Sequence, residues 1–98
     1  MKLTVTREAA DWLRRELSLT RGDSLRFHTM LYGNAASIHP NFSLGLSKEE
    51  PKRIGAKTEL DGVTYYMEQE DMWYLDGHTL TVRLQGDELD YVFAGESP

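Results

Sequence analysis

The chain has 98 residues, of which 40% are hydrophobic and 28% are charged, a composition typical of one small folded domain over residues 1–98. The formal net charge of −5 and the scattered lysines and arginines argue against nucleic acid and anionic membranes as partners. The absence of cysteine excludes disulfides, thiolate zinc sites, thiol nucleophiles and cysteine-bound iron–sulfur clusters within the chain. No apolar run reaches the length of a signal peptide or a membrane span, so we expect a cytoplasmic protein.

The N-terminal segment predicts a short strand followed by a helix. Leu3 and Val5 alternate with polar residues, as in a half-buried strand. Thr6 is a typical N-cap residue, and we expect a helix from there to about Leu19. The apolar stripe of this helix, at a spacing of four residues, consists of Ala9, Leu13 and Leu17. Such a stripe predicts packing against a sheet.

The rest of the chain predicts short strands and turns. Alternation predicts strands over residues 25–32 and 42–47, with a polar connection over residues 48–55. Asp61-Gly62 is a typical hairpin turn, and the acid-rich residues 68–75 suit a single helical turn better than a strand. Further strands are expected at residues 63–67, 80–84 and 89–93, separated by turns at Asp76-Gly77 and Gln85-Gly86-Asp87. The sum is a mainly β, α+β fold of about six short strands, in which one N-terminal helix lies against a curled, mainly antiparallel sheet or sandwich.

A polar loop over residues 33–45, GNAASIHPNFSLG, has the features of a binding-site rim. Its polar side chains at alternating positions are Ser37, His39 and Asn41. Among the three histidines, His39 is the favoured ligand or catalytic candidate because it lies in this loop, whereas His28 and His78 stand apart from it. A surface or hydrogen-bonded histidine is the alternative at each position. No metal-binding, phosphate-binding or serine-nucleophile motif accompanies the loop.

Acidic and aromatic residues gather on either side of residue 70. The acids are Glu68, Glu70, Asp71 and Asp76. They lack the ligand spacing of a calcium loop, so a solvated acidic turn is preferred over acid–base chemistry or cation binding. Tyr65 and Tyr66 point to opposite faces of their strand, which leaves one of them exposed, and Trp73 is expected on the core side of the turn. An aromatic surface for a protein partner is the alternative.

Several motifs, taken in chain order, are similar to those of a known family. They are residues 3–10 (LTVTREAA), Tyr32-Gly33, Leu60-Asp61-Gly62-Val63 and Leu75-Asp76-Gly77. Over about residues 1–94 the chain resembles the HesB/IscA family, the A-type iron–sulfur carriers. The segments FSLGLSKEEPKRIG and DGVTYYMEQEDMWYLDGH resemble more specifically the small, cysteine-lacking HesB-like proteins of Gram-positive bacteria, often called YneR-like. The resemblance implies a HesB-like β-sandwich or pseudo-barrel.

The resemblance also implies that the family's metal ligands are missing. Carrier-type members hold iron or a cluster with three cysteines, one in a Gly-Gly-Cys-Ser-Gly stretch and two in a Cys-Gly-Cys tail. The first stretch corresponds to residues 33–37, where the cysteine falls at Ala35 or Ala36, and the tail has no counterpart before Pro98. Because an alanine methyl has no lone pair for iron, carrier activity does not transfer. We therefore expect no cofactor and no metal site of the family type.

Three functions follow as hypotheses. The first is an accessory or interaction role related to iron–sulfur biogenesis, with a protein partner and without enzymatic activity. The alternative is a small binding module that holds a metal ion or small ligand in the loop from Gly33 to Phe42, with Asn34, Ser37 and His39 as candidate residues. An acid–base enzyme built on His39 and carboxylates ranks last. Because the carrier-type relatives associate, the resemblance also suggests a homodimer.

Overall fold

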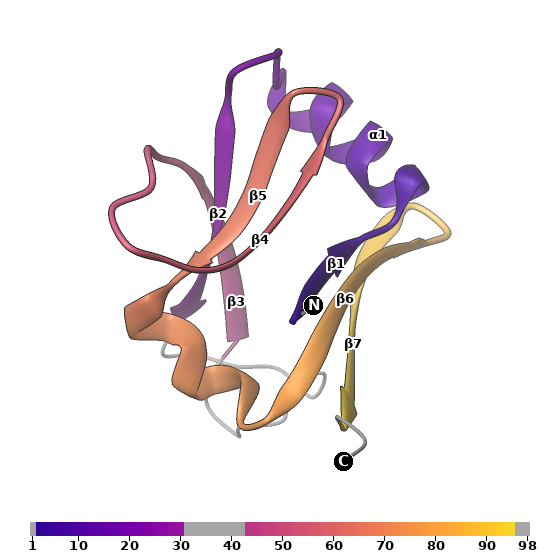
Figure 1. Ribbon diagram of the computed structural model, residues 1–98. Helices are drawn as coiled ribbons and strands as arrows, with labels where there is room; N and C mark the ends of the chain where they lie inside the picture. Colours follow the sequence, from indigo (N-terminus) through magenta and orange to yellow (C-terminus); the bar gives the residue numbers. More distant parts are fainter. Residues whose placement is uncertain (1, 31–42, 96–98) are drawn as a thin grey trace.

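The computed structural model describes residues 2–30 and 43–95, which form two β-sheets and two helices (Figure 1). The strands are β1 (Leu3–Val5), β2 (Ser24–Met30), β3 (Ser43–Lys48), β4 (Ile54–Leu60), β5 (Val63–Glu68), β6 (His78–Gln85) and β7 (Glu88–Gly95). The α-helix α1 spans Arg7–Leu17, and the 3-10 helix η1 spans Gln69–Leu75. Neither helix in these ranges is long and apolar enough to cross a membrane.

The predicted elements are present, with shifts at their ends. The Thr6 hydroxyl caps α1 by accepting a hydrogen bond from the backbone N–H of Ala9 at 3.3 Å. The helix ends at Leu17, earlier than predicted, because Ser18 adopts a left-handed conformation with φ of 52°. The described residues contain seven strands rather than about six, because Ile54–Leu60 forms the additional strand β4, which begins inside the predicted polar connection.

The two sheets share one core. The three-stranded sheet has the order β1-β6-β7, and the four-stranded sheet has the order β3-β2-β5-β4. The edge strands β1 and β4 are in contact, and the Thr58 hydroxyl donates to the carbonyl oxygen of Leu3 between them. The shared core draws on both sheets and on α1, and it includes Leu3, Leu13, Leu25, Phe27, Met67 and Val82. This is the mainly β, α+β arrangement that the sequence predicts.

The connection between β3 and β4 crosses the outer face of the four-stranded sheet, because these strands lie at its opposite edges (Figure 1). The Tyr66 hydroxyl donates to the carbonyl oxygen of Glu49 in this connection at 2.9 Å. The Glu68 carboxylate accepts from the backbone N–H of Lys52 at 3.1 Å and from that of Arg53 at 2.9 Å. Two side chains of β5 therefore hold the crossing segment on the sheet.

The exposure of the paired tyrosines differs from the prediction. Tyr65 and Tyr66 do point to opposite faces, but both are 0% exposed. Tyr65 belongs to the core, and Tyr66 lies beneath the crossing connection. The expectation that one of them is exposed was wrong, because alternation within a strand does not report a distant segment that covers its outer face.

The helix η1 follows β5 directly and docks against β2 through one carboxylate. Asp71 Oδ2 accepts from Arg26 Nη2 at 2.8 Å, and Asp71 Oδ1 accepts from the Thr29 hydroxyl at 2.9 Å. The backbone pairing between β5 and β2 ends at the pair Tyr66–Arg26. Beyond this pair, the two hydrogen bonds of Asp71 connect η1 to β2. The predicted helical turn is confirmed, but the predicted solvation is wrong for Glu68 and Asp71, which are 4% and 6% exposed.

Replacing Glu68 tests whether its carboxylate holds the crossing connection. In Glu68→Gln the amide offers one acceptor oxygen and places an NH₂ group against a backbone N–H, so we expect the free energy of unfolding to fall by about 1–3 kcal/mol. Urea denaturation measures this change. Glu59→Gln is the matched control, because Glu59 forms only an exposed pair with Lys57 and should cost at most about 0.5 kcal/mol. Equal losses in the two variants would contradict the assignment.

The Arg26–Asp71 pair is tested by a double-mutant cycle. We expect Asp71→Asn to lower the free energy of unfolding by about 3 kcal/mol, because it leaves a largely buried guanidinium without its main partner. Arg26→Met together with Asp71→Asn should cost less than the sum of the two single changes, with a coupling of about 1–3 kcal/mol. Arg83→Met, which breaks the exposed pair with Asp90, is the control and should cost under about 1 kcal/mol. Additive losses at residues 26 and 71 would show that the pair is not coupled.

Candidate functional site

The candidate residues from the sequence fall in different places. Asn34, Ser37 and His39 lie outside the described residues, as does the loop from Gly33 to Phe42 that contains them. His28 lies on the face of β2 that carries Arg26, its Nδ1 3.5 Å from the carbonyl oxygen of Thr29. His78 begins β6 in the other sheet, with its Nδ1 2.9 Å from the carbonyl oxygen of Leu75. The two described histidines therefore belong to separate local networks.

The donor set of the chain does not fit the cluster of the carrier family. Iron–sulfur clusters are held by cysteine thiolates, and this sequence contains no cysteine. Within residues 2–30 and 43–95, no three histidine, aspartate or glutamate side chains form a group that could hold a metal ion. The described residues therefore offer no such group of side chains for a metal ion.

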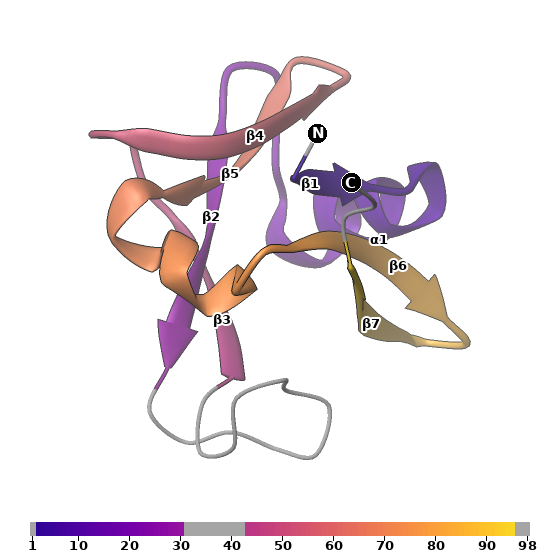
Figure 2. The same cartoon turned by 60° about the horizontal axis from the view of Figure 1, so that its bottom comes forward.

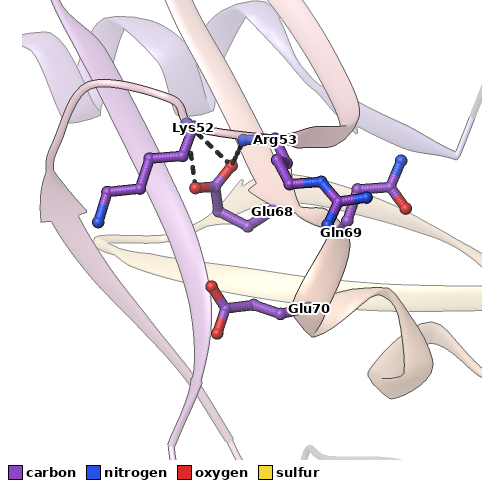
Figure 3. Close-up of a pocket in the computed structure, with 5 residues that line it drawn as sticks. All are labelled: Lys52, Arg53, Glu68, Gln69 and Glu70. Atoms are coloured by element: carbon purple, nitrogen blue, oxygen red, sulfur yellow. Dashed lines mark hydrogen bonds between the residues drawn. The ribbon is translucent and has the colours of Figure 1, made fainter.

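A hollow of about 330 Å³ lies where the crossing connection meets the start of η1 (Figure 3). Its lining residues are Lys52, Arg53, Glu68, Gln69 and Glu70. Figure 3 shows the Glu68 carboxylate turned toward the backbone N–H groups of Lys52 and Arg53, while those two side chains extend to opposite sides. Both oxygens of the buried acid accept hydrogen bonds from the backbone, so this carboxylate stabilises the fold.

The exposed side of η1 carries one tryptophan between two acids. A 3-10 helix has three residues per turn, so residues i and i+3 lie on the same face. Glu70 and Trp73 follow this spacing, Asp76 is the C-cap residue directly after the helix, and all three are exposed, Trp73 at 50%. Residues 71, 74 and 75 are buried instead. The set Glu70, Trp73 and Asp76 is called the η1 outer face below.

The position of Trp73 is opposite to the one expected. Its neighbour Tyr74 is the aromatic side chain on the core side, 1% exposed, with its ring centroid 5.9 Å from that of Phe93. The indole packs edge-on against Tyr74, with ring centroids 5.8 Å apart and an interplanar angle of 86°. A spacing of three residues along the sequence shows which side chains face the core and which face solvent. This spacing can be applied only when the turn is known to be a 3-10 helix.

Apolar side chains also lie where η1 meets the start of β4. Met72 lies so close to Gly55 that a Cβ at this glycine would collide with the methionine side chain. Next to it, Ile54 is 37% exposed, and its carbonyl oxygen accepts from Gln69 Nε2 at 3.4 Å. Met72 of η1 and Ile54 of β4 thus supply apolar side chains at the junction of these two elements.

The charges near η1 are divided between the interior and the surface. Asp71 accepts a hydrogen bond from the Arg26 guanidinium, and this bond is the main cause that holds the arginine's pKa above its ordinary value. Burial raises the pKa of Tyr66, so its phenol stays protonated as a donor to the crossing connection. Glu70 lies 3.6 Å from Arg26 Nη2, but its side chain is 75% exposed. The η1 outer face therefore presents negative charge to solvent.

Comparisons with known proteins identify relatives along nearly the whole chain. No protein-family model matches the sequence. A pyruvate dehydrogenase inhibitor of Bacillus subtilis is 38% identical over 93 residues, covering 95% of this chain and 97% of the relative. An uncharacterised protein of Staphylococcus saprophyticus is 28% identical over 95 residues, covering 93% of this chain and 97% of the relative.

The fold is also found in a solved structure. The crystal structure of Escherichia coli SufA, a protein involved in the biosynthesis of iron–sulfur clusters, superposes with a TM-score of 0.57. The match covers 95% of this chain and 79% of SufA, at 23% sequence identity, and it confirms the expected HesB-like fold. This chain, which has no cysteine, therefore belongs to the YneR-like, HesB-like family of the Bacillus subtilis pyruvate dehydrogenase inhibitor and has the fold of the HesB/IscA iron–sulfur carriers.

Proposed function

We propose that this protein is a non-enzymatic regulator that binds pyruvate dehydrogenase and inhibits it. The observation that carries the proposal is the 38% identity to the Bacillus subtilis inhibitor over nearly the full length of both chains. The proposal makes the expected protein partner specific and replaces iron–sulfur biogenesis as the process served. The likeness to SufA supports the fold alone, because the two sequences are only 23% identical.

The chemistry of the chain supports inhibition by contact. With no cysteine, it has no thiolate for a cluster, for a disulfide with the target or for covalent attack. The two acids of the described chain that are buried, Glu68 and Asp71, are occupied by backbone N–H groups and by Arg26 and Thr29. The exposed tryptophan of η1 suits recognition of another protein, because aromatic side chains are enriched at protein interfaces. We place this activity in the cytoplasm, as the sequence leads us to expect.

The proposal predicts saturable, reversible inhibition. Purified pyruvate dehydrogenase from the same organism is assayed for NADH formation from pyruvate while the protein is added in increasing amounts. We expect the rate to fall to a plateau at a fixed molar ratio and to recover on dilution, because a contact inhibitor consumes nothing and modifies nothing. The Bacillus subtilis inhibitor serves as the positive control, and heat-unfolded protein serves as the negative control.

Size-exclusion chromatography with light-scattering detection of the same samples measures binding independently of activity. A complex that elutes together with pyruvate dehydrogenase supports the proposal, and the mass of the free protein tests the suggested homodimer. An unchanged rate together with the absence of a complex would refute the proposed function. Inhibition that persists after dilution would refute the contact mechanism, because it requires a chemical modification of the target.

A further inference from the structure

We propose that the η1 outer face is the docking surface, and that its partner offers an apolar pocket of indole size rimmed by lysine or arginine side chains. This inference rests on the proposed function, because it names the part of the regulator that contacts pyruvate dehydrogenase. It adds a site, a central residue and the chemistry of the complementary surface.

The first step is the exposure of Trp73. Within the described residues the exposed large hydrophobic side chains are Trp73 at 50%, Met30 at 43% and Ile54 at 37%. Tryptophan is among the residues most enriched at the energetic centres of protein interfaces, since one side chain buries a large apolar area. Ile54, also partly exposed, lies at the start of β4, and this strand is in contact with η1.

The second step is that Trp73 is held in place before binding. Below it, Tyr74 is wedged between the indole and Phe93, and Leu75 is 2% exposed in the core. On the side of β2, Asp71 ties the helix to Arg26 with a bond of 2.8 Å. A side chain already fixed in its bound position loses little conformational entropy on docking, so more of its burial contributes to affinity.

The third step is the charge that flanks the indole. Residues 68–76 contain four acids (Glu68, Glu70, Asp71 and Asp76) and no lysine or arginine, while the nearby cations lie on the sides of β2 and the crossing connection, where Arg26 is 3.6 Å from Glu70 and Lys52 and Arg53 line the hollow. The two buried acids are satisfied within the fold, whereas Glu70 and Asp76 stay exposed on either side of Trp73. An overall charge of −5 adds to this local field. Complementarity therefore calls for a partner surface with positive charge around the pocket that receives the indole.

The first arm of the test measures affinity with Trp73→Ala. Binding to immobilised pyruvate dehydrogenase should weaken by roughly 30-fold, the loss expected when an interface hot spot is truncated. Trp73→Phe keeps a ring and should lose much less. Far-UV circular dichroism and the melting temperature establish that both variants are folded, which separates loss of contact from loss of structure. An unchanged dissociation constant for folded Trp73→Ala would overturn the inference.

The second arm isolates the charges with a matched pair of double variants. Glu70→Gln with Asp76→Asn removes the two acids beside the indole, and asparagine accepts the left-handed backbone that residue 76 adopts at φ of 49°. Asp87→Asn with Glu88→Gln makes the same change in net charge at the turn between β6 and β7. Figures 1 and 2 both show this turn at the opposite end of the molecule from η1.

The two double variants should differ in kinetics. We expect the η1 variant to associate several-fold more slowly at low salt and to show a flatter salt dependence, while the variant at the distant turn keeps most of the wild-type rate. Equal effects of the two variants would assign the electrostatics to net charge and would overturn the docking site. Wild-type protein that neither binds nor inhibits refutes the proposed function instead, so the two failures are distinguishable.

Discussion

The structure depends on the crossing of the connection between β3 and β4 over the outer face of the four-stranded sheet. These strands occupy opposite edges, so the chain has to lie across the sheet, and its polar backbone needs partners there. Glu68 supplies them from the last position of β5, immediately before η1 begins. The backbone N–H of Gln69 also donates to the carbonyl oxygen of Arg53 at 2.8 Å. The crossing segment and the start of η1 are thus fixed by the same contacts, and the orientation of the η1 outer face follows from them.

The four acids of residues 68–76 have two different environments, buried and solvated, because the backbone changes from strand to 3-10 helix within this segment. Glu68 ends a strand and Asp71 lies on the inner side of a 3-10 helix, so both are buried against donors. Glu70 lies on the outer side of the same helix, Asp76 follows the helix as its C-cap residue, and both are solvated. Sequence composition alone treats these four carboxylates as equivalent. Their difference comes from the change in period, from two in β5 to three in η1.

The parts of the fold that the sequence predicts are those set by local chemistry. The Asp61-Gly62 turn has positive φ at both residues, 52° and 81°, as its composition requires. The cap at Thr6 is equally local. The burial of Tyr66 and the partners of Glu68 are long-range results, because the covering segment comes from another part of the chain. The side of Trp73 was wrongly predicted for a related reason: it was expected inside, and only the register of the 3-10 helix and the contact between Tyr74 and Phe93 show which aromatic ring faces the core. The predicted loop site with Asn34, Ser37 and His39 lies outside the described residues and stays a prediction.

The Arg26–Asp71 pair gives a final reason to regard η1 as a positioned element. A largely buried ion pair is an inefficient way to gain stability, because desolvation of both charges offsets most of their attraction, and an apolar pair of similar volume often does as well. Apolar contacts are tolerant of direction, whereas Asp71 accepts from Arg26 and Thr29 at 2.8 and 2.9 Å with one oxygen for each donor. The pair therefore contributes orientation more than free energy of folding. Orientation of η1 matters little for the core, which Leu75 and Tyr74 fill, but it determines where Trp73 points. A fold that in this chain lacks the thiolates of a carrier thus holds one aromatic side chain, Trp73, in a fixed orientation at the surface.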